Sequence, residues 1–140
     1  QMIGTIRTLD YGMKELIRKR MNEIVPKIAS AYGATASIKI TDGASITYND
    51  PELTKMMLPT LQDVAGPANV ILSDAVTGAE DFSYFQEKVP GLYFFLGGTP
   101  LSVAENEAPS HHTPDFYVAD ESMLLGVKTM TRLALDYLKN

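Results

Sequence analysis

Hydrophobic side chains recur at helical spacing in two long stretches of the chain. Between residues 12 and 32, and again between residues 120 and 138, apolar side chains return every third or fourth position. This spacing places them on one face of a helix. Pro26 lies inside the first stretch, where it removes a main-chain hydrogen bond and crowds the preceding turn. We therefore expect two long helices, with a kink or a late break near Pro26.

Local signals mark further helix boundaries. Asp50 can accept hydrogen bonds from free amides, and Pro51 lacks an amide that would need a partner, so a helix is expected from Pro51 to about residue 65. Asp120 is expected to cap the last helix in the same way. Gly33 is expected to end the first helix.

Four shorter segments have the pattern of strands. Residues 3–9 and 35–48 alternate apolar with polar or small side chains, and residues 69–73 form a short apolar run. Residues 92–96 are continuously apolar, which is typical of a strand covered on both faces. The combination of helices and strands predicts an α/β fold.

The order of the elements changes near residue 49. Before it the pattern gives strand, helix, strand, as in an α+β sheet with one face on a helix. After it helices and strands alternate, as in a parallel α/β sheet. We therefore expect two domains, comprising residues 1–48 and residues 49–140.

Charge and composition exclude several classes of partner. The 140 residues carry 17 acidic and 12 basic side chains, a net charge of -5, and no dense basic cluster, so a nucleic-acid partner is not expected. No apolar run approaches the roughly 20 residues that span a bilayer, so no membrane partner is expected. Cysteine is absent, which excludes disulfides and thiolate metal ligands.

The two histidines of the chain, His111 and His112, are adjacent and precede Thr113 and Pro114. Imidazole is the commonest neutral metal ligand, so one of them is a candidate ligand. In an extended backbone the two rings would point to opposite sides, and only one would face a given ion. Two solvent-exposed loop histidines would give the same sequence, and both interpretations stay open.

Other polar residues lie where ligands gather in α/β proteins. Glu80 and Asp81 precede an expected helix after a strand, and they could either contact a ligand or only complement the helix dipole. Arg7 could bind a carboxylate through two hydrogen bonds or be a solvated strand residue. Asn49 could contact a substrate or be a turn residue ahead of the Asp50 cap.

Five short motifs, in order along the chain, resemble a known family. They are Gly4-Thr5-Ile6-Arg7-Thr8, Asn49-Asp50-Pro51-Glu52-Leu53, Gly78-Ala79-Glu80-Asp81-Phe82, Leu96-Gly97-Gly98 and His112-Thr113-Pro114-Asp115-Phe116. Together they resemble the C-terminal part of metal-dependent amidohydrolases of the hippurate hydrolase and aminoacylase type. That family includes auxin-conjugate hydrolases and carboxypeptidase-like enzymes. The resemblance covers essentially the whole chain.

The resemblance implies an enzyme that hydrolyses the amide bond of N-acyl amino acids or small peptides. It implies a catalytic domain that holds two divalent metals, with zinc expected first and manganese, cobalt or nickel as alternatives. An inserted lid, of which residues 1–48 would be part, implies a homodimer. By the same resemblance His112 is a metal ligand. The residues expected to bind substrate are Arg7, Asn49, Glu80, Asp81 and Gly98.

The catalytic machinery of that family is incomplete in this sequence. The chain contains no Glu-Glu pair and no His-x-Asp motif, so the general base and most metal ligands are expected in an N-terminal part outside it. We therefore expect a C-terminal fragment that is inactive in isolation. The alternative is a non-catalytic association module, in which the exposed edge of residues 3–9 pairs with a second copy or a partner chain.

Overall fold

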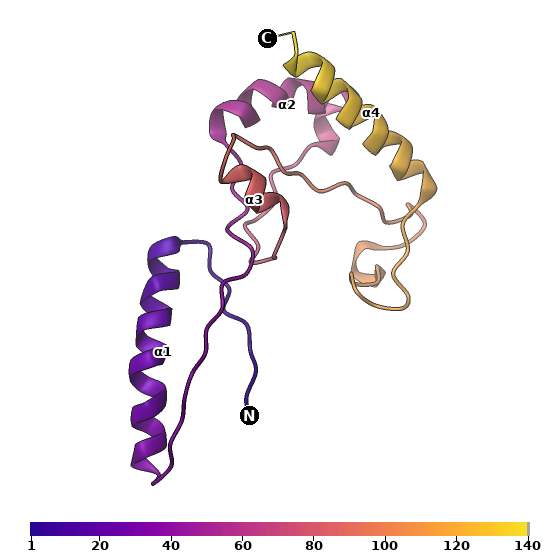
Figure 1. The fold of residues 1–140 in the computed structure, drawn as a ribbon. Helices are drawn as coiled ribbons and strands as arrows, with labels where there is room; N and C mark the ends of the chain where they lie inside the picture. The colour runs from indigo at the N-terminus through magenta and orange to yellow at the C-terminus, as the bar shows by residue number, and fades with distance from the viewer. Residues whose placement is uncertain (140) are drawn as a thin grey trace. The chain divides into compact units, whose positions relative to one another are not determined.

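The computed structural model describes residues 1–139 and is drawn in Figure 1. Helices separated by irregular segments make up this part of the chain, and a membrane-spanning helix was not found in it. The α-helices are α1 (Tyr11–Ala31), α2 (Pro51–Ala65), α3 (Phe82–Gln86) and α4 (Asp120–Tyr137), and the single-turn 3-10 helices are η1 (Pro67–Asn69) and η2 (Glu105–Glu107).

The α/β prediction is wrong, because no β-strand occurs within residues 1–139. The segments expected as strands, 3–9, 35–48, 69–73 and 92–96, are irregular and form no ladder with a neighbouring segment. A helix satisfies its main-chain groups within its own segment, whereas a strand needs a second segment beside it. Hydrophobic alternation therefore indicates where a strand could form, but it does not supply the partner.

The chain divides into two compact units. The first comprises residues 1–48 and 73–90, and the second comprises residues 49–72 and the chain from residue 91 onward. Each candidate site residue can therefore be assigned to one unit.

The first unit contains α1, which starts and ends through local contacts. The Asp10 carboxylate accepts a hydrogen bond from the Met13 amide at 2.6 Å and caps the helix. The helix passes through Pro26 and ends at Ala31, and Gly33 follows with a left-handed backbone, φ 68°. The expected stop near Gly33 is confirmed.

After Gly33 the chain turns back and runs beside α1 (Figure 1). Asp42 on this returning segment pairs with two cations of the helix, Lys14 at 2.9 Å and Arg18. Hydrogen bonds from Lys14, the larger cause, and from Arg18 hold the pKa of Asp42 below its usual value. Two ion pairs thus join the returning segment to the first half of α1.

In the second unit α2 and α4 pack against each other (Figure 1). These two helices carry the most buried side chains of the unit, Met57 at 3% exposure, Thr60 at 7% and Thr129 at 4%. The Thr60 hydroxyl donates to the Asp136 carboxylate at 3.0 Å, and this bond is the main cause that lowers the pKa of Asp136. Arg132 adds an ion pair to Asp63 at 3.4 Å.

The expected helix caps have different outcomes. The Asp50 carboxylate accepts from the Leu53 amide at 2.8 Å and caps α2 as expected. The cap expected at Asp120 is wrong, because Ala119 holds the cap position and Asp120 is the first helical residue. Asp120 instead lies in the first turn, where its charge complements the helix dipole.

Much apolar surface stays exposed. Met57 is the one fully buried hydrophobic side chain among the residues described, while Ile3, Ile71 and Leu72 are 91%, 81% and 100% exposed. Two of the segments expected to be strands, residues 3–9 and 69–73, thus carry uncovered apolar side chains.

Candidate functional site

Arg7, Glu80 and Asp81 belong to the first unit. The exposed Arg7 guanidinium donates a hydrogen bond from Nη1 to the Thr77 carbonyl at 3.0 Å, across 70 residues of sequence. Thr77 directly precedes the Gly78-Ala79-Glu80-Asp81 motif. The structure therefore joins the first motif of the chain to the loop that carries the two carboxylates.

Glu80 and Asp81 lead into the short helix α3. The half-buried Glu80 accepts from the Phe82 amide at its carboxylate, 3.3 Å, and from the Ser83 amide at its carbonyl, 3.1 Å. Asp81 holds the cap position of α3 without a side-chain capping bond, and its carboxylate is exposed. Of the two, Glu80 is fixed by the turn and Asp81 faces solvent.

Ser83 was not among the residues predicted from the sequence to have a functional role. Its side chain is completely buried, and its hydroxyl has no hydrogen-bond partner among the described residues. Buried hydroxyl groups are nearly always paired, so this one is unusual. Only its position directly after the Glu80-Asp81-Phe82 motif could have pointed to it.

Asn49 and Gly98 belong to the second unit. The Asn49 side chain forms two hydrogen bonds with the main chain of Tyr93. The Gly98 carbonyl accepts from the Ala119 amide at 2.8 Å, directly before α4. A β-carbon at Gly98 would lie 3.1 Å from a methyl of Val118, so a side chain there would require Val118 to shift by a few tenths of an ångström.

His112 also belongs to the second unit and has a left-handed backbone, φ 63°, which is uncommon for a residue other than glycine. The extended backbone considered for the His111-His112 pair is therefore not found at His112. The His111 ring packs edge-on against Phe116 with centroids 4.8 Å apart, while the exposed His112 imidazole takes no part in that contact. Such backbone strain is enriched at functional sites.

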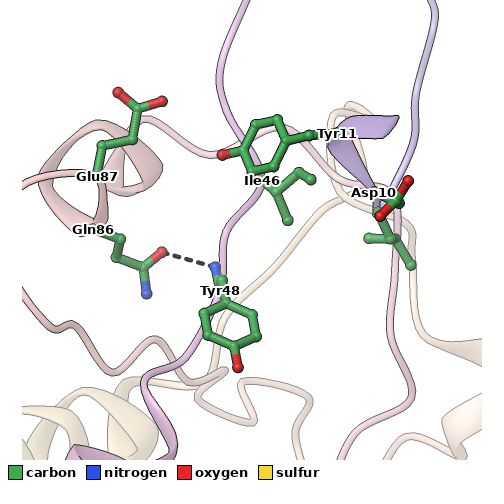
Figure 2. Close-up of a pocket in the computed structure, with 7 residues that line it drawn as sticks. Asp10, Tyr11, Ile46, Tyr48, Gln86 and Glu87 are labelled. Carbon is green, nitrogen blue, oxygen red and sulfur yellow. Dashed lines mark hydrogen bonds between the residues drawn. The ribbon is translucent and has the colours of Figure 1, made fainter. Parts of the chain in front are cut away.

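A hollow of about 290 Å³ lies in the first unit, apart from all six predicted site residues. Figure 2 shows its walls, where the Tyr48 amide donates to the Gln86 side chain at 3.1 Å. The residues that line it are Leu9, Asp10, Tyr11, Ile46, Tyr48, Gln86 and Glu87. The carboxylates in its walls already have partners, because Asp10 caps α1 and Glu87 accepts from Ser45.

The comparison with known protein families decides the assignment. The model of peptidase family M20/M25/M40 matches residues 4–136. The chain belongs to this family. The predicted resemblance to metal-dependent amidohydrolases is thereby confirmed, and the five motifs lie within the matched range.

Curated M20 relatives carry names of several hydrolases. Thermostable carboxypeptidase 2 of Saccharolobus solfataricus is 35% identical over 98% of this chain and 34% of its own length. Putative amidohydrolase YhaA of Bacillus subtilis is 29% identical over 97% of this chain and 34% of its own. IAA-amino acid hydrolase ILR1-like 2 of Arabidopsis thaliana is 29% identical over 97% and 31%. No solved structure matches the chain significantly.

The chain thus spans about a third of the length of these M20 relatives. The family generally uses divalent metals. Within residues 1–139, no group of three or more His, Cys, Asp or Glu side chains is arranged to hold a metal ion. The described residues therefore do not form a complete metal site.

Proposed function

We propose that this chain forms the C-terminal third of a metal-dependent hydrolase that cleaves the amide bond of N-acyl amino acids or small peptides. The observation that carries the proposal is the M20/M25/M40 family match over residues 4–136. Residues 1–48 would be part of a lid and residues 49–140 the end of the catalytic domain. The names of the carboxypeptidase, amidohydrolase and IAA-amino acid hydrolase relatives support an amide substrate.

His112 would be the one metal ligand that this chain supplies, with zinc as the first expectation and manganese, cobalt or nickel as alternatives. Both histidines are exposed, but the His111 ring packs on Phe116 and the His112 ring does not, and this difference and the left-handed backbone at His112 support the role of His112. The other ligands and the general base would come from the remaining two thirds of the protein. The chain alone would therefore be inactive.

The residues proposed to contact the substrate, from the family motifs that carry them, are Arg7, Glu80, Asp81, Asn49 and Gly98. The Arg7 guanidinium is suited to bind a substrate group, because it has five N–H donors and the bond to Thr77 uses one of them. The remaining donors can bind a carboxylate through two hydrogen bonds.

A chimera tests the proposal. Residues 4–136 replace the matching third of thermostable carboxypeptidase 2, which is 35% identical, and hydrolysis of N-acyl amino acids is measured with each metal. We expect hydrolysis by the chimera and none by the 140-residue chain. His112→Ala should lower chimera activity by more than about 100-fold, since ligand loss exceeds the effect of outer-shell changes.

His111→Ala is the matched control and should keep chimera activity within a few-fold. Equal losses in both variants would contradict the role of His112. Rapid turnover by the 140-residue chain would contradict the proposal that the catalytic machinery lies elsewhere.

We also propose that the intact protein is a homodimer through its lid portion. The exposed side chains of residues 3–9, with Ile3 at 91% and Leu9 at 48% exposure, support an association surface there. Sedimentation of the intact protein over a range of concentrations tests this. A monomer at all concentrations would contradict it.

A further inference from the structure

The Asn49 side chain joins the start of α2 to a segment 44 residues away. Its Nδ2 donates to the Tyr93 carbonyl at 2.7 Å, and its Oδ1 accepts from the Tyr93 amide at 2.6 Å. A side-chain amide holds a donor and an acceptor side by side, as a main-chain peptide group does. Asn49 therefore occupies both main-chain groups of Tyr93, as a neighbouring strand would.

The neighbouring residue strengthens this junction. The Asp50 amide donates to the Gly91 carbonyl at 3.0 Å, while the Asp50 carboxylate caps α2 by accepting from Leu53 at 2.8 Å. Asn49 and Asp50 thus bind the 91–93 segment through three hydrogen bonds and start the helix at the same time. The position of residue 93 is therefore tied to the first turn of α2.

The same segment is held again at its other end. The Gly98 carbonyl accepts from the Ala119 amide, directly before α4, at 2.8 Å. Between the two ends, Leu96 lies close to Gly126 of α4. A β-carbon added at residue 126 would lie 2.9 Å from a methyl group of Leu96. Residues 91–98 are therefore hydrogen-bonded to the start of α2 at one end and to the residue before α4 at the other.

We propose that Asn49 is a positioning residue that fixes the register of residues 91–98 and so determines where Gly98 lies. Loss of the two Asn49 bonds would remove the side-chain link between Tyr93 and the start of α2, and the path of the chain from Tyr93 to Gly98 would be less firmly set. Its value for catalysis rests on the proposed function, in which Gly98 lies beside the substrate. Asn49 would then act through the main chain of Tyr93.

Hydrogen exchange at the Tyr93 amide in the 140-residue chain measures the junction directly. Loss of one hydrogen bond of ordinary strength should speed this exchange about two- to tenfold in Asn49→Ala. Asn69→Ala is the matched control, because Asn69 also donates to a main-chain carbonyl, that of Ala65 at 2.7 Å. It should leave Tyr93 exchange unchanged.

Asn49→Asp separates this junction from a general loss of structure. The neutral acid can donate to the Tyr93 carbonyl and accept from its amide, whereas the carboxylate has no donor and places negative charge beside the carbonyl oxygen. The ratio of Tyr93 exchange in Asn49→Asp to that in the wild type should therefore rise as pH rises through the aspartate range, near about 3.9. Recovery at low pH is rescue by a conservative variant.

Three outcomes would overturn the proposal: an unprotected Tyr93 amide in the wild type, equal exchange in Asn49→Ala, or a pH-independent ratio in Asn49→Asp. If Asn49→Ala does not fold, the pH dependence of Asn49→Asp still decides. None of these measurements requires hydrolysis. An inactive chimera would therefore count against the proposed function and leave the role of Asn49 standing.

Discussion

Helix α1 and the α2–α4 pair are similar in sequence pattern but differ in how they are stabilised. Each helix carries an apolar stripe, yet α1 has no buried residue, and Met13, Leu16 and Ile28 on it are 49%, 52% and 56% exposed. In the α2–α4 pair, Met57, Thr60 and Thr129 are buried. Capping and ion pairs hold α1, whereas packing holds α2 on α4. An apolar stripe therefore predicts a helix but does not reveal whether its partner is present.

Among the substitutions that test this difference, truncation of Met57 should have the largest effect on stability. Met57→Ala removes the best-buried hydrophobic side chain and should lower the free energy of unfolding of the α2–α4 pair by about 2 to 5 kcal/mol. Met56, which is 45% exposed, provides the control. Met56→Ala should change the free energy of unfolding by less than about 0.5 kcal/mol. Denaturation followed by helical circular dichroism measures both. Equal effects would show that burial at Met57 does not stabilise the pair.

Loss of the Asp10 cap should have a smaller effect, confined to α1. Asp10→Ala leaves the Met13 amide without its acceptor and should destabilise the helix by about 1 kcal/mol. Asp10→Asn retains a capping oxygen and should cost only a few tenths of a kcal/mol. Hydrogen exchange of the first-turn amides measures the difference. Protection changes that spread equally to α2 and α4 would contradict a local cap.

Acidification should have the smallest effect, and it should act on both regions. The pKa of Asp42 and that of Asp136 are held below 3.8, so each carboxylate stabilises the folded state above that pH. This contribution is lost as pH falls through the lowered pKa, and it is small because exposed ion pairs are weak.

Single substitutions separate the two sites. Asp42→Asn should remove the acid dependence of the segment beside α1, and Asp136→Asn that of the α2–α4 pair. Exchange protection measured between about pH 2 and 5 tests this, since ordinary aspartates titrate near about 3.9. Loss of protection well above pH 4 in the wild type would contradict the lowered pKa values.

The helices could be predicted from sequence because their signals are local. The stripe of residues 12–32, the stop at Gly33 and the cap at Asp50 all lie within a few residues of the boundaries they set. The cap at Asp120 was misplaced by one residue, since Ala119 takes that position without a side-chain bond. The four predicted strands do not form within the described residues, because strand formation depends on pairing with a second segment, which local patterns do not reveal.

The residue types of the candidate site could be recognised from motifs, but their contacts could not. The bond from Arg7 to Thr77 spans 70 residues, and the pairing of Asn49 with Tyr93 spans 44. Spacing in the sequence carries no information on such contacts. The burial of Ser83 could not be predicted either, because a serine after acidic residues at a helix start is usually an exposed surface residue.

At His112 the left-handed backbone favours glycine, whereas a function of the imidazole requires histidine. Glycine adopts a φ of 63° freely, so His112→Gly would relax the turn while it removed the ring. Selection for thermal stability would therefore favour glycine at this position, whereas under the ligand role proposed for His112, selection for metal affinity would favour histidine. A library screened separately for each property would thus diverge at residue 112.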